Sequence, residues 1–250
     1  MMSRVLLLHG WDWEKYPVFK PKDQWQNRQE LVAKLRKRYD VNYPSLPGFG
    51  CDDVHRTGSW TLDDYADWLQ SEIVCGRYSA IIGYSFGCAV ATHWQYLYRD
   101  SSVSLVLLSP AIARAYGKPP NKALTLLASA LKLLRMNWVV YVLRRLYLTQ
   151  VANNPHVIHG TPFLRDTYSN IVAVDLSDEL VQLIGDNFPI TCIFGGEDTA
   201  TPPETLFSRA PAARSLSLVI PGGTHDIGGT HPGEIVKHIV DFLNSLRVRQ

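Results

Sequence analysis

Short apolar runs alternate along the chain with longer segments in which apolar residues recur every three or four positions. Runs of this kind, separated by amphipathic helices, are typical of the buried strands of a parallel sheet. The runs lie at residues 4–8, 39–43, 78–83, 103–108, 189–194 and 215–220. The helical segments lie at 24–38, 62–75, 86–99, 203–209 and 233–247. The pattern predicts an α/β fold with about six strands, flanked by helices.

One connection is too long for a simple crossover between strands. It follows the fourth apolar run and covers residues 111–188, with Leu124, Leu127, Leu131 and Leu134 at helical spacing. We interpret it as a helical lid inserted into a core formed by residues 1–110 and 189–250.

The segment Gly83-Tyr84-Ser85-Phe86-Gly87 follows the third run and opens a helical segment. A Gly-x-Ser-x-Gly sequence between a strand and a helix forms a turn so tight that larger flanking side chains would clash. The serine hydroxyl is then exposed. Because an ordinary serine is a poor nucleophile, it needs a base, an orienting acid and donors for an oxyanion.

Two later loops carry residues of the required types. Asp198 follows the run at 189–194, and His225 follows the run at 215–220. Both loops lie at carboxyl ends of strands, where open α/β sheets place their chemistry. The order serine, aspartate, histidine differs from the orders found in chymotrypsin and subtilisin.

Four motifs occur together in one order: His9-Gly10-Trp11, Leu46-Pro47-Gly48-Phe49-Gly50, the Ser85 turn, and His225 followed by His231-Pro232. With these motifs the chain resembles the α/β-hydrolase superfamily of lipases and esterases. It resembles more loosely the pimeloyl-acyl-carrier-protein methyl ester esterase subgroup and related small carboxylesterases.

The resemblance implies a role for each motif. Ser85 would be the nucleophile, Asp198 the acid and His225 the base. The backbone N–H groups of Trp11 and Phe86 would form the oxyanion hole. It also implies a serine hydrolase acting on a carboxylic ester or thioester, with no cofactor.

Some alternatives remain open. Glu197 competes with its neighbour Asp198 for the acid, and His231 competes with His225 for the base. His9 is expected to hydrogen-bond backbone rather than to react. The same triad also serves carbon–carbon hydrolases and acyltransferases, and the fold serves some non-catalytic binding proteins.

The chain departs from the usual family pattern at its start. Most members begin with two strands before the His-Gly loop, one of them antiparallel. Here the strand that leads to His9 begins at Arg4. We therefore expect a reduced, wholly parallel sheet.

Composition and charge argue against several other classes of function. A net charge of +2 argues against nucleic acid as the main partner. The four cysteines have no short pairing or metal spacing, the remaining histidines show no ligand spacing, and no apolar stretch is long enough to span a bilayer. These features favour a reduced, cytoplasmic enzyme with a small-molecule substrate and no metal.

The expected lid is basic. It carries Arg114, Lys118, Lys122, Lys132, Arg135, Arg144 and Arg145, with no acidic residue among them. The ordinary explanation is a solvated face. The alternative is a docking surface for an anionic partner such as an acyl carrier, a coenzyme A thioester or lipid headgroups.

Overall fold

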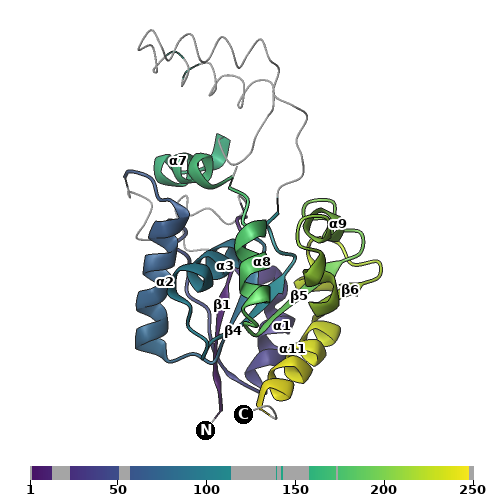
Figure 1. Ribbon diagram of the computed structural model, residues 1–250. Coiled ribbons are helices and arrows are strands. Elements are labelled where there is room, and N and C mark those ends of the chain that lie inside the picture. Colours follow the sequence, from purple (N-terminus) through teal and green to yellow (C-terminus); the bar gives the residue numbers. More distant parts are fainter. Residues whose placement is uncertain are drawn as a thin grey trace.

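The computed structural model describes residues 2–12, 23–50, 57–113, 158–172 and 174–247, together with positions 139 and 142. Six strands form one sheet in the order β2-β1-β3-β4-β5-β6, and every neighbouring pair is parallel (Figure 1). The strands are β1 Arg4–Leu8, β2 Asp40–Asn42, β3 Ala80–Tyr84, β4 Ser104–Leu108, β5 Ile190–Gly195 and β6 Ser217–Ile220. The expected α/β fold with a wholly parallel sheet is confirmed.

Helices cover both faces of the sheet. One face packs against α2 Leu62–Gly76, α3 Phe86–Tyr98 and α8 Ser177–Gly185, and the other against α1 Gln29–Arg36, α10 Ile227–Thr230 and α11 Pro232–Arg247. Figure 1 shows these two layers on either side of the strands. The other described helices are α7 Pro162–Ile171, α9 Pro203–Phe207 and the 3₁₀ helices η2 Gln26–Arg28 and η5 Pro211–Leu216.

Strand β1 shows why this layering follows from the sequence. Its side chains alternate between the two cores, with Leu6 and Leu8 in one and Val5 and Leu7 in the other. All four are fully buried. Burying an aliphatic side chain of this size contributes roughly 1.5–3 kcal/mol. A continuous apolar run therefore has to lie between two helical layers.

The element boundaries differ from the sequence-based expectations in small ways. The helix expected at 62–75 is α2, and Thr61 and Asp64 form a capping box at its start. The strand expected at 215–220 begins only at Ser217, because η5 continues through Leu216. The helix expected at 24–38 starts with the 3₁₀ turn η2.

The strand order creates one switch point. The chain runs from β1 outward to β2 and then returns to pair β3 on the other side of β1. Leu8 at the end of β1 lies opposite Gly83 in β3. The loops after β1 and β3 therefore leave the same edge of the sheet side by side, which is where open α/β sheets bind ligands.

Only part of the expected lid is described. Helices α7 and α8 lie within residues 111–188, and whether the whole segment forms a lid stays a prediction. The leucine-bearing helix expected near Leu124 and all seven basic residues lie outside the described residues. None of the helices that the structure describes has the length and apolarity needed to cross a membrane.

His93 ties α8 to the rest of the helical layer. Its ring lies 2.6 Å from Asp63 in α2 and 3.0 Å from Glu179 in α8. Burial opposes the charged ring, but the hydrogen bonds and charges of Glu179 and Asp63 outweigh it and raise the pKa of His93. The His93 ring thus links three helices, and the two carboxylates favour its protonated form.

His93→Gln should therefore destabilise the protein in a pH-dependent way. Because the folded-state pKa is raised, the stabilisation is complete below the unfolded value near 6.5 and is lost as the pH rises through the folded value. Urea unfolding should show a larger loss at about pH 5.5 than at about pH 8.5.

His238→Gln is a control for which the stability loss should depend on pH in the opposite direction, because burial lowers the pKa of His238. The loss for His238→Gln should be smaller at the acidic pH than at the alkaline one. A His93→Gln effect that is equal at both pH values would contradict the charged link.

Candidate active site

Ser85 occupies a strained turn between β3 and α3. Its φ of 51° and ψ of −108° are unusual for a residue with a side chain and cost on the order of 1–3 kcal/mol. The turn persists because the chain packs closely around it. A Cβ on Gly83 would lie 2.8 Å from the Cys88 nitrogen, and one on Gly87 would overlap the Leu8 carbonyl oxygen. The glycines thus allow α3 to start against the end of β1.

The loop after β1 runs beside this turn. A Cβ on Gly10 would lie 3.1 Å from the Ser85 Cβ. His9 holds the loop: Nδ1–H donates to the Gly10 carbonyl at 2.7 Å, and Nε2 accepts from the Leu46 N–H at 2.8 Å. Burial lowers the pKa of His9 to about 4, so the ring is neutral and can accept. The expected backbone-bonding role of His9 is confirmed.

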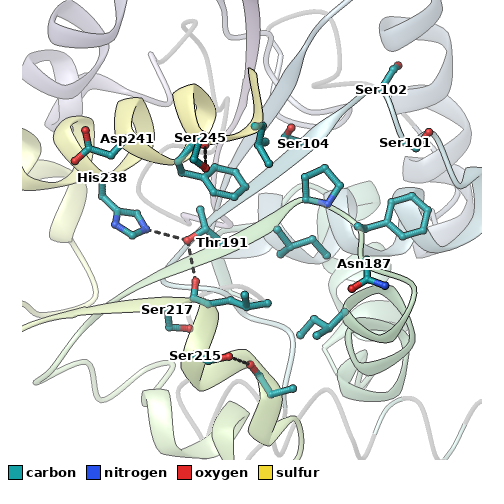
Figure 2. A pocket seen from close by; sticks show the side chains of 18 residues that line it. Ser101, Ser102, Ser104, Asn187, Thr191, Ser215, Ser217, His238, Asp241 and Ser245 are labelled. Atoms are coloured by element: carbon teal, nitrogen blue, oxygen red, sulfur yellow. Dashed lines mark hydrogen bonds between the residues drawn. The ribbon is translucent and has the colours of Figure 1, made fainter. Parts of the chain in front are cut away.

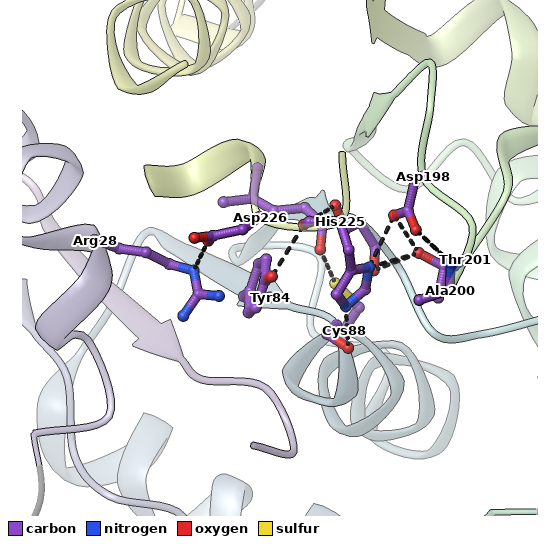
Figure 3. A network of polar contacts seen from close by, with 11 residues as sticks. Arg28, Tyr84, Cys88, Asp198, Ala200, Thr201, His225 and Asp226 are labelled. Atoms are coloured by element: carbon purple, nitrogen blue, oxygen red, sulfur yellow. Dashed lines mark hydrogen bonds and ion pairs between the residues drawn. The ribbon is translucent and has the colours of Figure 1, made fainter. Parts of the chain in front are cut away.

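Three polar side chains from different loops meet at this edge of the sheet. His225 Nε2 lies 3.1 Å from the Ser85 hydroxyl oxygen. His225 Nδ1 lies 2.8 Å from Asp198 Oδ2, a contact that Figure 3 shows. Ser85 is half-buried, and about a third of the His225 side chain (31%) is exposed. The structure therefore brings together the three residues that the sequence suggested, in a hydrogen-bonded line reachable from solvent.

Asp198 is suited to orient the imidazole. Its carboxylate is fully buried, and it accepts the backbone N–H groups of Ala200 and Thr201, both at 2.8 Å, and the Thr201 hydroxyl at 2.8 Å. Burial alone would raise its pKa, but the hydrogen bonds from His225 and Thr201 outweigh this and lower the pKa to about 2. Asp198 is therefore ionised at neutral pH and can hold the proton of His225 on Nδ1.

The competing candidates lie elsewhere. Glu197 is exposed, whereas its neighbour Asp198 is buried against His225. The Nδ1 atom of His231 lies 2.8 Å from the Thr230 hydroxyl, just before α11. The geometry thus favours Asp198 and His225 over both alternatives.

The sequence matches the alpha/beta hydrolase family over residues 5–238. The chain belongs to this family. Comparison with curated proteins gives no significant match.

Solved structures of other hydrolases share the fold. A thermophilic esterase from Thermogutta terrifontis is 20% identical, with a TM-score of 0.63 over 97% of this chain and 90% of the esterase. A meta-cleavage product hydrolase from Pseudomonas fluorescens is 18% identical, with a TM-score of 0.62 over 98% and 91% of the two chains. A serine hydrolase involved in carbazole degradation is 19% identical, with a TM-score of 0.63 over 97% and 91%. At these identities the likeness shows the fold alone.

Aromatic rings surround the two residues expected to form the hydrolase's oxyanion hole. The Trp11 ring lies 4.9 Å from that of Phe86, 5.1 Å from that of Phe49 and 5.7 Å from that of Tyr168 in α7. Phe86 is also the first residue of α3, so its N–H has no acceptor within the helix. The use of the two backbone N–H groups as oxyanion donors stays a prediction.

Three supporting residues were missed by the sequence analysis. Thr201 bonds Asp198, and its hydroxyl lies 3.3 Å from His225 Nδ1. The hydroxyls of Tyr84 and Ser109 both donate to the His225 carbonyl at 2.9 Å. Aspartate often accepts the backbone N–H two residues on in an Asx turn, and this preference was the available signal for the loop that contains Thr201. No local pattern points to the other two.

A large cavity lies away from this site. It has a volume of about 790 Å³ and is lined by the first residues of β4, β5 and β6 together with α11 (Figure 2). At its centre the Thr191 hydroxyl donates to the Leu216 carbonyl and contacts His238. The cavity is therefore at the opposite end of the strands from Ser85.

In the part of the chain that the structure describes, no cluster of three or more His, Cys, Asp or Glu side chains could hold a metal ion.

Asp198→Asn should reduce kcat far more than Glu197→Gln does. The amide would favour the wrong tautomer of His225, a change that costs roughly 10⁴ in kcat in a well-studied triad. Steady-state ester hydrolysis by the two variants, with folding checked by circular dichroism, measures the difference. A larger loss in Glu197→Gln would mean that the other carboxylate is the acid.

Proposed function

We propose that the protein is a serine hydrolase that cleaves a carboxylic ester or thioester through an acyl-enzyme. The observation that carries this proposal is the line of contacts from the Ser85 hydroxyl through His225 to the buried Asp198 carboxylate. A serine on a strained turn, bonded to a histidine that is itself oriented by a carboxylate, is the arrangement that activates a hydroxyl for acyl transfer.

The reaction would proceed in two halves. As Ser85 Oγ bonds to the carbonyl carbon, His225 Nε2 takes the hydroxyl proton, and the carbonyl electron pair moves onto oxygen. Collapse of the tetrahedral intermediate breaks the bond to the leaving alcohol or thiol, which takes the proton from His225. Water then attacks the acyl-enzyme by the same route and releases the acid and free Ser85.

Two further groups would stabilise the charges that develop. Asp198, ionised because its pKa is about 2, would stabilise the imidazolium form of His225. The N–H groups of Trp11 and Phe86 would bind the oxyanion, and each such donor is typically worth about 10²–10³ in rate. The mechanism calls for no cofactor.

The aromatic surroundings favour an apolar acyl group. Trp11 and Tyr168 are partly exposed, and their rings are 5.7 Å apart beside the Ser85 turn. Aromatic side chains in such a place contribute apolar surface that recognises acyl chains or rings. The acyl-carrier partner considered for the lid has no support among the described residues.

A carbon–carbon hydrolase is the second candidate. The structural likeness to a meta-cleavage product hydrolase, with a TM-score of 0.62, is nearly as close as the likeness to an esterase, with 0.63. Parallel assays with an ester and with a substrate that carries a cleavable carbon–carbon bond would separate the two. Hydrolysis of only the second substrate would replace the esterase proposal and keep the triad.

Ser85→Ala should abolish the hydrolysis of p-nitrophenyl esters and the covalent labelling by a fluorophosphonate. Loss of a triad nucleophile costs on the order of 10⁴–10⁶ in kcat. Ser79→Ala is a matched control, because Ser79 is exposed, lies just before the first residue of β3, far from the Ser85 turn, and bonds the Arg4 carbonyl. Substantial turnover by Ser85→Ala, or equal losses in both variants, would overturn the assignment.

A further inference from the structure

A buried cation lies behind His225 and takes no part in the reaction described above. Arg28, at the junction of η2 and α1, is only 8% exposed. Its guanidinium lies 3.9 Å from the centre of the Tyr84 ring, and its Nε lies 2.7 Å from Asp226 Oδ1 as an ion pair. Figure 3 shows Arg28, Asp226, Tyr84 and His225 in one connected network.

Both partners of Arg28 are joined directly to His225. Asp226 is the next residue in the chain. Tyr84 donates its hydroxyl to the His225 carbonyl at 2.9 Å, and its ring centre lies 5.5 Å from that of His225. Burial, the largest influence, raises the pKa of Tyr84, so the phenol keeps the proton that it donates. One guanidinium thus braces the residue after His225 and the residue that holds its carbonyl.

The packing around Arg28 is close. A Cβ on Gly228 would lie 3.0 Å from the Arg28 Cδ, and one on Gly229 would lie 2.7 Å from Asp226 Oδ2. Gly228 therefore lets α10 approach the Arg28 side chain, and Gly229 leaves room for the Asp226 carboxylate. A buried charge is costly unless it is paired, and here the Asp226 carboxylate and the Tyr84 ring face compensate it.

We propose that Arg28 is a positioning residue for His225. By pairing with Asp226 and lying over Tyr84, it fixes the loop that carries His225 and keeps Nε2 at its 3.1 Å distance from the Ser85 hydroxyl. This proposal rests on the proposed function. Proton transfer depends steeply on such a distance, and a displacement of about 1 Å from a remote change can cost 10²-fold.

Arg28→Met removes the charge and keeps most of the apolar stem. We expect kcat to fall roughly tenfold to a hundredfold with little change in KM. The rate of fluorophosphonate labelling at Ser85 should fall in parallel, because labelling uses the same base. A purely structural role would instead lower the fraction of active enzyme without slowing the enzyme that labels.

Arg4→Met is the matched control. Arg4 also pairs with a carboxylate, Asp40 at 3.0 Å, and lies over a tyrosine ring, Tyr78 at 5.0 Å, but at the amino end of β1. The Arg4→Met variant should keep the wild-type kcat and labelling rate. A loss in Arg4→Met equal to that in Arg28→Met would overturn the proposal.

Asp226→Asn tests the same link if Arg28→Met fails to fold, because the Asp226 side chain is 40% exposed. The kcat of Asp226→Asn should fall, as that of Arg28→Met does. Where both variants fold, the double variant should lose no more activity than Arg28→Met alone, since paired residues are not additive. Full activity of folded Asp226→Asn, or additive losses in the double variant, would overturn the proposal.

Failure of this proposal can be told from failure of the proposed function. If wild-type Ser85 does not label or turn over esters, the proposed function fails. If the wild type labels and Arg28→Met labels at the same rate, only the positioning role of Arg28 fails.

Discussion

The close approach of α3 to the end of β1 is the constraint on which the site depends. Gly87 lies so near the Leu8 carbonyl that no side chain fits, and this contact holds Ser85 in its positive-φ conformation. The same contact sets the His9-Gly10-Trp11 loop beside the serine. Because β1 and β3 pair at the switch point of a parallel sheet, one packing contact fixes both the nucleophile and its neighbouring backbone.

The strands and the Ser85 turn could be predicted from the sequence, because their residue types follow directly from burial and from close backbone packing. Buried parallel strands have no polar face, so the runs containing Leu6 or Val106 were recognisable as strands. The glycines at positions 83 and 87 predicted the tight turn at Ser85. Asp198 and His225 each follow a strand, and the carboxyl ends of parallel strands share one edge. The sequence could not separate Glu197 from Asp198 by type, and burial of one carboxylate against His225 makes the distinction.

The contacts that support His225 could not be predicted from the sequence, because they join residues that are far apart along the chain. Tyr84 and His225 are 141 positions apart, and their hydrogen bond follows from packing rather than from any local pattern. The same holds for Arg28, which lies buried between Tyr84 and Asp226, two residues far from it in the sequence. The start of β6 was also misplaced, because Leu216 is apolar like the strand residues that follow it but ends the 3₁₀ helix η5. The basic residues of the expected lid lie outside the described residues, so that prediction stands as made.

The central claim is that Ser85 carries the acyl group during turnover. The most direct measurement is acid quenching of the enzyme during steady-state hydrolysis of a p-nitrophenyl ester, followed by intact-mass analysis and peptide mapping. We expect a mass increase equal to one acyl group, located on the peptide that contains Ser85 and absent in Ser85→Ala. Ester turnover with the acyl group on another residue would contradict it.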